Sequence, residues 1–458
     1  MKSVQTLVIG GGNAALTAAI TCAESGLKTL ILEAAPVYER GGNTKYTRDI
    51  RYMHSQDKFT SGEYTKKEFL ADLRSVSGNK LDEHMAETVI EDSENIPRWM
   101  ENHGVKFKKG EIKGTLSLAR TNAFFLGGGK ALINSYHEFA KKIGIKILYN
   151  AEVQDLRFKE KRCEHIVVRL GTERIQVSAD WVIIASGGFE ANLEKLREYW
   201  GDIINNFIIR GTKHNKGFPL FSMIKNGAKT IGSPYEGHMV AVDARAPKFD
   251  GGIVTRIDAI PMGIVINKNG KRFYDEGEDL WPKRYAIWGR LIAEQPDQIA
   301  YVIIDSKMLT DFLPTAYPPY FSNDLKDLFR QLNLPVDSCI ETVKKFNDSV
   351  VIGKFNKTTL DECHTEGLNP PKSHWARKID TPPFYAYPLR PGLTFTYMGL
   401  KVNHEGQVLS SDGEFENVLA AGEVMSGNVL TKGYLGGFGL TIGTVFGMRA
   451  GRFVSNKK

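Results

Sequence analysis

Small residues near the N-terminus have the spacing of a turn that binds phosphate. Gly10, Gly12 and Ala15 occupy the three positions of a G-x-G-x-x-G/A pattern. The first glycine permits a tight turn, the second lets the backbone approach a pyrophosphate, and the third position needs only a small side chain. Glu33 lies 23 residues after Gly10, close to the spacing at which a carboxylate binds ribose hydroxyls. The pattern therefore predicts a site for an adenine dinucleotide.

The elements that must position these residues are a strand, a helix and a second strand. The run LVIGG at 7–11 is apolar and β-branched, as in a strand buried on both faces, and a helix is predicted over 13–25. The helix would direct its N-terminal N–H groups and the positive end of its dipole at the diphosphate. A glycine-rich turn without a ligand is the alternative, and the acid that follows in register counts against it.

Composition narrows the class of protein. With 458 residues, two or three domains are expected, and 42% hydrophobic and 25% charged residues are typical of a globular protein. The net charge of +7 contains no block of five Lys or Arg, which argues against nucleic acid as a partner. The four cysteines form no CxxC pattern, so no metal site is predicted. The sequence predicts neither a signal peptide nor a membrane span, and we expect a cytoplasmic protein.

The distribution of predicted strands, glycines and prolines along the chain suggests one domain interrupted by another. Strands are predicted at 145–149, 152–158, 165–170, 174–178 and 181–185, and glycine-rich strands resume near 394. The region from about 233 to 384 differs, because it holds 13 of the 18 prolines. We therefore predict an α/β fold in which residues 1–232 and 385–458 form the dinucleotide-binding domain and residues 233–384 form an inserted capping domain.

Several further segments resemble the flavoprotein subunits of the fumarate reductase and succinate dehydrogenase family. They are GGNT (41–44), WVIIASGGF (181–189), NKNGKRFYDE (267–276), PGLTFTYMGLKV (391–402) and NVLAAGEV (417–424). The resemblance implies a two-dinucleotide-binding-type FAD domain, Rossmann-like with a central parallel sheet, interrupted by an α+β capping domain that covers the substrate.

The resemblance also assigns residues to the cofactor. FAD would be held by Gly10, Gly12, Asn13, Ala14, Glu33, Gly42, Asn43, Thr44, Val153, Ala185, Gly187, Glu423, Gly439 and Leu440. The helix that starts near Gly439 would direct its dipole at the flavin ring. Relatives with covalent flavin have a histidine in the loop that here reads Asn43, Thr44 and Lys45, so we expect non-covalent FAD.

The implied chemistry removes two hydrogens from adjacent carbons flanked by carboxylates, one as hydride and one as a proton. The catalytic candidates are Arg284, His238, Thr255, Arg256, Tyr397 and Tyr434. Arg284 would transfer the proton, with Arg272 and Arg290 as competitors. Arg256 stands where the family has a glutamate, and we expect it to bind a third carboxylate. Arg48 and Arg51 could face either the substrate or the surface.

The resemblance implies a dehydrogenase that converts tricarballylate to cis-aconitate. A reductase, or an enzyme for a bulkier substrate such as a ketosteroid, is the alternative, and a catalytically silent flavin-binding subunit is a third. The sequence has no second dinucleotide pattern, so a separate redox protein is expected as electron acceptor. By analogy with the family that partner would be membrane-associated, which would place the enzyme at the periphery of the inner membrane.

Overall fold

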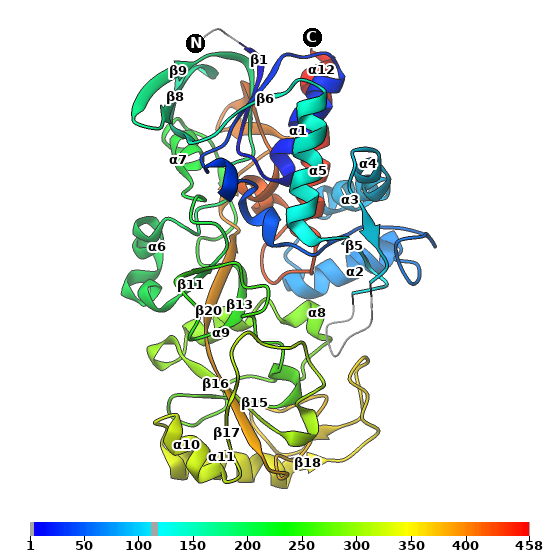
Figure 1. Cartoon of the computed structure of the whole chain (residues 1–458), viewed down its shortest axis with the longest axis vertical. Helices are drawn as coiled ribbons and strands as arrows, with labels where there is room; N and C mark the ends of the chain where they lie inside the picture. Colours follow the sequence, from blue (N-terminus) through cyan, green and yellow to red (C-terminus); the bar gives the residue numbers. More distant parts are fainter. Residues whose placement is uncertain (1–3, 111–117, 458) are drawn as a thin grey trace.

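The apolar N-terminal run forms the centre of a mostly parallel sheet. A computed structural model describes residues 4–110 and 118–457 (Figure 1). The sheet has the order β22-β23-β10-β1-β2-β6, and only the edge pair β22–β23 is antiparallel. Its strands are β1 (Val4–Ile9), β2 (Thr29–Leu32), β6 (Lys146–Leu148), β10 (Ala179–Ile184), β22 (Gln407–Ser410) and β23 (Gly413–Ala420). The predicted α/β fold is confirmed.

Two helices from opposite ends of the chain pack closely beside this sheet (Figure 1). They are α1 (Asn13–Glu24) and α12 (Phe438–Asn456). Glycines on α12 allow the approach: a Cβ on Gly447 would lie 2.8 Å from the Ala14 carbonyl oxygen and 3.0 Å from Thr17 Cβ. The small residues thus bring the N-terminus of α12 to the same edge of the sheet as the turn that precedes α1.

Smaller elements surround the parallel sheet. The predicted strands at 152–178 form an antiparallel sheet of β7 (Ala151–Lys159), β8 (Arg162–Leu170) and β9 (Glu173–Val177). A second small sheet contains β3 (Asp49–Arg51), β4 (Phe107–Lys108) and β5 (Asn122–Phe125). The helices here are α2 (Lys66–Ser77), α3 (Glu83–Ser93), α4 (Ile96–Asn102) and α5 (Gly128–Lys142). The Thr65 side chain caps α2 by accepting a hydrogen bond from the Glu68 N–H at 3.2 Å.

The other half of the molecule is built on a second sheet around β20 (Phe384–Thr396), which runs along it toward the first half (Figure 1). The order is β14-β11-β20-β16-β15, and β13 and β17 also pair with β20. These strands are β11 (Ile208–Arg210), β13 (Gly237–Asp243), β14 (Phe249–Asp250), β15 (Ile264–Asn267), β16 (Ala300–Asp305) and β17 (Tyr320–Ser322). Because β20 lies almost entirely beyond residue 384 and pairs with β13, β16 and β17, the sheet crosses the predicted domain boundary, and the division at 232 and 385 stays a prediction.

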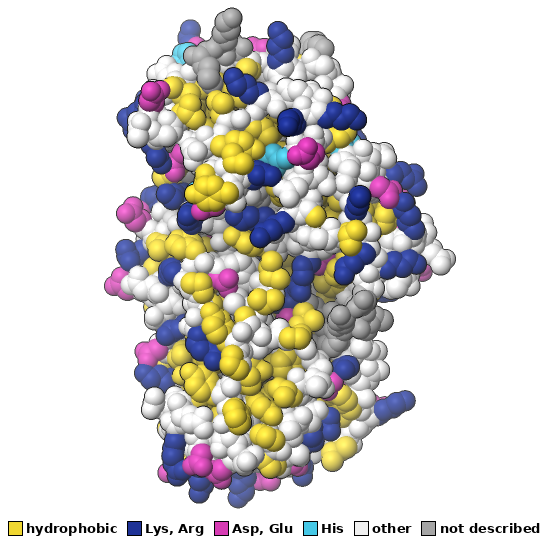
Figure 2. Space-filling model, in the orientation of Figure 1, with side chains coloured by type: hydrophobic (Ala, Val, Ile, Leu, Met, Phe, Trp, Pro, Cys, Tyr) yellow, Lys and Arg dark blue, Asp and Glu magenta, His cyan; other side chains and the backbone are white. Residues whose placement is uncertain are grey.

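Helices and short strands complete the fold. The helices are α6 (Leu193–Trp200), α7 (Phe218–Lys225), α8 (Trp281–Arg284), α9 (Trp288–Ala293), α10 (Leu325–Gln331) and α11 (Val336–Ser349). The short strands are β12 (Thr230–Ile231), β18 (Val350–Val351), β19 (His364–Thr365) and β21 (Gly399–Leu400). Within the described ranges, no helix is long and apolar enough to cross a membrane. Lys and Arg side chains are scattered along the face in Figure 2.

The contact between α1 and α12 gives a test of the fold. We expect Gly447→Val to destabilise the protein by about 1–3 kcal/mol, because the larger side chain must separate two packed backbones. Thermal unfolding monitored by circular dichroism measures the effect. Arg452→Ala, at an exposed position on the same helix, is the matched control. Equal melting temperatures for the two variants would contradict the close packing.

Candidate active site

One long cavity begins at the carboxyl ends of the parallel strands. Hydrogen bonds hold these ends level: the Gly10 N–H donates to Leu32 at 2.8 Å, and the Ala185 N–H donates to Ile9 at 2.9 Å. Crevices at this edge of an α/β sheet are where such folds bind ligands. Every residue predicted to bind the cofactor lines the cavity, namely Gly10, Gly12, Asn13, Ala14, Glu33, Gly42, Asn43, Thr44, Val153, Ala185, Gly187, Glu423, Gly439 and Leu440.

The glycine turn between β1 and α1 leaves the backbone open to a ligand. Gly10 has φ of 116°, and a Cβ there would overlap the Ala185 carbonyl, so only glycine fits. The nearest atom to a Cβ built on Gly12 would be Thr44 Oγ1, at 3.4 Å. The protein itself therefore does not crowd the backbone here, and a ligand can approach it. The Asn13 N–H, the first of α1, donates to the same Thr44 oxygen at 3.0 Å.

Glu33 is a buried acid in this part of the cavity whose hydrogen bonding is incomplete. Its Oε1 accepts a hydrogen bond from the Ala35 N–H at 2.9 Å, while its buried Oε2 has no partner among the described residues. Burial raises the pKa of the Glu33 carboxyl, and hydrogen bonds from Ala35 and Gly41 oppose that rise. A buried carboxylate oxygen without a donor is costly, and a ribose hydroxyl would supply one. The residues present therefore fit the adenosine half of a dinucleotide.

The loop at 41–44 is fixed from three directions. Asn43 donates through Nδ2 to Glu190 Oε1 at 2.8 Å and to the Thr394 carbonyl at 2.9 Å. Its Oδ1 accepts a hydrogen bond from the Thr212 N–H at 2.8 Å. Because all the hydrogen-bonding groups of this amide are engaged, the loop holds one position against the cavity.

Three arginines line another part of the same cavity: Arg48 before β3, Arg210 at the end of β11, and Arg256. Arg256 forms a two-point ion pair with Asp258, at 2.7 and 2.9 Å. Arg210 donates only to neutral groups, the Gly252 carbonyl at 3.1 Å and Thr394 Oγ1 at 3.1 Å. Within the described residues, neither Arg48 nor Arg210 has a carboxylate within 4.0 Å. Asp49 also lines the cavity and acts on Arg48 electrostatically, so three guanidinium groups face two carboxylates, Asp49 and Asp258, and this part of the cavity carries excess positive charge.

The arginines influence one another electrostatically, which shows that they are close. Burial, followed by the charges of Arg256 and Arg48, lowers the pKa of Arg210 to about 10. Burial and the charge of Arg256 lower the pKa of Arg48 as well. For Arg256, burial opposes the charge, but Asp258 outweighs it and the pKa is raised. An anion bound among these groups would relieve their mutual repulsion.

Aromatic rings complete the cationic part of the cavity. His238 stacks on Tyr434 with ring centroids 4.0 Å apart, and the Tyr434 hydroxyl accepts a hydrogen bond from the Gly439 N–H at 2.8 Å. Burial and the charges of Arg210 and Arg256 lower the pKa of His238 well below its ordinary value, so the imidazole is neutral. Tyr285 lies beside His238 and Arg256. Its ring centroid is 5.4 Å from the His238 centroid and 4.8 Å from the Arg256 guanidinium.

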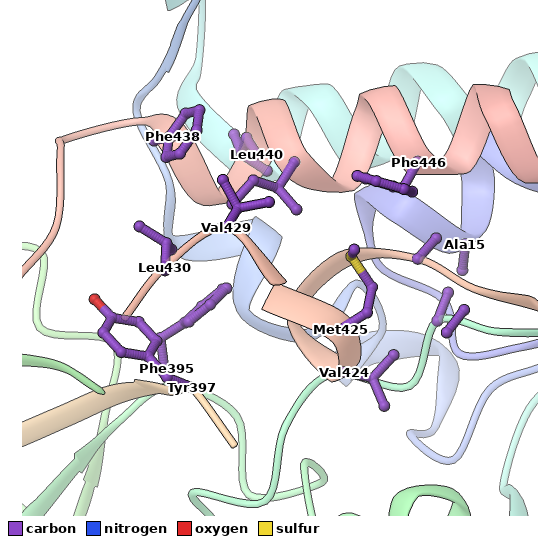
Figure 3. Close-up of a cluster of buried hydrophobic side chains, with 14 of the residues drawn as sticks. Ala15, Phe395, Tyr397, Val424, Met425, Val429, Leu430, Phe438, Leu440 and Phe446 are labelled. Atoms are coloured by element: carbon purple, nitrogen blue, oxygen red, sulfur yellow. The ribbon is translucent and has the colours of Figure 1, made fainter. Parts of the chain in front are cut away.

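Of the predicted catalytic residues, the structure brings His238, Arg256 and Tyr434 to the cavity and leaves the other three outside its lining. The Thr255 hydroxyl donates to Asp250. The Tyr397 hydroxyl donates to the Gly433 carbonyl, and its ring lies fully buried in a hydrophobic cluster at the end of β20 (Figure 3). Arg284 pairs with Glu278 at 3.2 Å. Their catalytic roles stay predictions that this geometry does not support.

Other site residues escaped the sequence analysis. Arg210 ends a short strand without a motif, and Tyr285 directly follows the predicted Arg284. Glu190 ends the GGFE segment, three residues after the predicted Gly187. Of the two surface-or-substrate alternatives, Arg48 lines the cavity, whereas Arg51 donates to the Gly436 carbonyl at 3.0 Å and to Tyr64.

Comparison with known proteins agrees with this site. Residues 5–440 match the family model described as "FAD binding domain". The chain is 24% identical to NADH:fumarate oxidoreductase from Klebsiella pneumoniae over 98% of its own length and 47% of that protein, so it spans about half the length of this relative.

Solved structures share the fold. An open conformation of a flavocytochrome c3 fumarate reductase superposes with a TM-score of 0.75 at 20% identity, covering 99% of this chain and 78% of that one. The 3-ketosteroid Δ1-dehydrogenase from Sterolibacterium denitrificans gives a TM-score of 0.77 at 16% identity, with both chains fully covered.

Glu33 provides a test of the adenosine half of the site. We expect Glu33→Gln to weaken FAD binding by about 10- to 100-fold, because hydrogen bonds to a charged group contribute about 1.5–3 kcal/mol. Titration of the apoprotein with FAD, followed by flavin fluorescence, measures the affinity. Glu198→Gln alters an acid on α6 that pairs with Lys195 at 2.7 Å outside the lining, and it should leave the affinity within about twofold. Equal affinities for the two variants would contradict the assignment.

Proposed function

The chain belongs to the FAD binding domain family, among flavoproteins related to fumarate reductase, and on this basis we propose that it oxidises or reduces a carbon–carbon bond in a small polycarboxylate. FAD, when bound, supplies the hydride-transfer chemistry. The chain's own residues would bind the acid groups, orient the reacting bond and carry the proton. The predicted substrate pair, tricarballylate and cis-aconitate, is the first to test.

The observation that carries this proposal is the excess positive charge around Arg48 and Arg210. Two buried or half-buried guanidinium groups without a carboxylate partner are unfavourable for the protein alone. A substrate carboxylate would pair with each of them through charge-assisted hydrogen bonds and so fix the substrate in one orientation. Arg256 is held by Asp258, and it would contribute to a third carboxylate only with the guanidinium nitrogen that this ion pair leaves free.

The same charges argue against a ketosteroid. Sequence similarity to a steroid dehydrogenase covers 66% of this chain, at 26% identity, whereas similarity to NADH:fumarate oxidoreductase covers 98%. A steroid would cover Arg48, Arg210 and Arg256 with apolar surface and leave two of the charges unpaired. Removing each such charge from water costs several kcal/mol. The polycarboxylate is therefore the substrate class that the cavity favours.

We propose Tyr285 as the group that transfers the proton. No hydrogen-bond partner of its hydroxyl is found among the described residues, and it lines the cavity beside the arginines. Burial raises the pKa of Tyr285, while the charges of Arg256 and Arg210 oppose the rise. A neutral phenol donates a proton in the reductive direction, and the nearby arginines would stabilise the phenolate in the oxidative one. The raised pKa keeps the phenol protonated at neutral pH in the absence of substrate.

Electron exchange requires a partner. The sequence contains no second dinucleotide pattern, so we propose that a separate redox protein, membrane-associated by analogy with the family, supplies or accepts the electrons. The FAD itself is proposed to be non-covalent, since Asn43, Thr44 and Lys45 occupy the loop where covalently flavinylated relatives have histidine.

Anaerobic titration tests substrate and direction together. We expect tricarballylate to bleach the oxidised flavin if the protein is a dehydrogenase, and fumarate or cis-aconitate to restore the yellow colour of the reduced flavin if it is a reductase. Arg210→Ala should raise the substrate concentration for half-maximal effect about 10- to 100-fold with FAD content unchanged, because a charged hydrogen bond is lost. Flavin that responds to none of a panel of di- and tricarboxylates would sink the proposal.

Two neighbouring variants test the proton-transfer group. We expect Tyr285→Phe to lower the rate constant of flavin reduction or reoxidation by about 10²- to 10⁴-fold, the usual contribution of a general acid or base. Arg284→Gln should change it by less than about tenfold, because that side chain pairs with Glu278 outside the cavity lining. Stopped-flow absorbance at saturating substrate measures both rates. The opposite ranking would assign the proton to Arg284.

A further inference from the structure

Two buried carboxyl groups face each other beneath the cofactor cavity. Glu190 follows the end of β10 and is completely buried, while Glu423 follows β23, lines the cavity and keeps 8% of its surface exposed. Gly188 shows how closely they approach: a Cβ built there would overlap Glu423 Oε1 and would lie 2.9 Å from Glu190 Oε2. The backbone has to be glycine at this point because carboxyl oxygens occupy the space.

The hydrogen bonds of the two groups all end on their Oε1 atoms and leave one fully buried oxygen, Glu190 Oε2, without a donor among the described residues. Glu190 Oε1 accepts from the side-chain amides of Asn43 and Asn215, at 2.8 and 2.7 Å. Glu423 Oε1 accepts from the Thr396 N–H at 2.9 Å and from its hydroxyl at 3.3 Å. A proton on Glu423 would supply a donor to Glu190 Oε2.

The surroundings contain nothing to neutralise two negative charges. Groups facing the pair are the amides of Asn43 and Asn215, the Thr396 hydroxyl and N–H, and the Gly188 N–H. In the part of the chain that the structure describes, neither carboxyl forms an ion pair with Arg, Lys or His. Two ionised carboxylates at hydrogen-bond distance in a buried site repel strongly, so one of them stays protonated.

We propose that Glu190 and Glu423 share a single proton and that this proton makes FAD binding dependent on pH. Glu190 is a positioning residue, because its Oε1 holds the Asn43 loop while its Oε2 holds Glu423 against the cavity. Burial raises the pKa of Glu423 well above its ordinary value, and the neighbouring Glu190 raises it further. Burial raises the pKa of Glu190 also, with Glu423 and the two amides opposing the rise. The inference depends on the cofactor and not on the proposed substrate.

The direction of the pH dependence is set by whether the apoprotein or the FAD-bound holoprotein has the higher pKa for the shared proton. Bound FAD would cover the exposed part of Glu423, which further disfavours the second ionisation. The holoprotein therefore has the higher pKa for the shared proton, and FAD binding takes a proton up from solvent. Affinity is then full below the pKa of the apoprotein pair and falls as the pH rises toward that of the holoprotein, by up to about tenfold per pH unit.

FAD affinity measured between pH 6 and 9 tests this inference. In the wild type we expect the dissociation constant to rise about tenfold or more across the range. In Glu190→Gln, the amide keeps hydrogen bonds to Asn43 and Glu423 but removes the shared proton, so the dissociation constant should change by less than about twofold. Glu194→Gln, at an exposed site on α6, is the control and should retain the wild-type slope. Parallel slopes in all three proteins would overturn the proposal.

Infrared spectroscopy supplies an independent readout. The holoprotein should show a carbonyl stretching band from a protonated carboxyl that disappears as the pH rises, and both Glu190→Gln and Glu423→Gln should lack that band. Because one carboxyl of the pair is already neutral in the wild type, at least one of these isosteric variants should fold and bind FAD. Retention of the band in both variants, or failure of both to fold, would contradict a shared proton.

Discussion

Close approach of backbone to backbone at the carboxyl edge of the parallel sheet is the constraint on which the site depends. At Gly10 the chain passes so near Ala185 that no side chain fits, and at Gly447 helix α12 meets α1 with equally little space. These approaches place the N-termini of two helices and the ends of β1, β2, β10 and β23 around one cavity. The charged side chains take their positions from that frame.

Charge divides the cavity into two regions. Glu33 and Glu423 line one region, with Glu190 buried behind Glu423, while Arg48, Arg210 and Arg256 outnumber the acids Asp49 and Asp258 in the other. The burial of unpaired charge lowers the stability of the protein without its ligands. Bound ligands would return that free energy, so the apoprotein should be less stable than the loaded form.

The sequence predicted the cofactor half of the site much better than the substrate half. The reason is the separation along the chain of the residues that form each half. Gly10, Gly12 and Glu33 belong to one strand–turn–helix–strand unit, where local spacing determines geometry. Arg210 reaches the cavity only because β11 pairs with β20, nearly two hundred residues later in the chain. Thr255 and Arg284 lie outside the cavity lining while their neighbours Arg256 and Tyr285 lie in it, because loop geometry decides which of two neighbouring residues faces inward. Tyr285 shows how one position changes the outcome.

Strand β20 links the two halves of the molecule physically. It is held by β11, β13, β16 and β17 on the capping side, while Thr394 and Phe395 near its end line the cavity and Thr396 binds Glu423. A strand that is hydrogen-bonded to neighbouring strands along both edges has little freedom to bend. The pairing of β20 therefore fixes where Thr394, Phe395 and Thr396 stand, and through them it fixes one wall of the cavity and the position of Glu423.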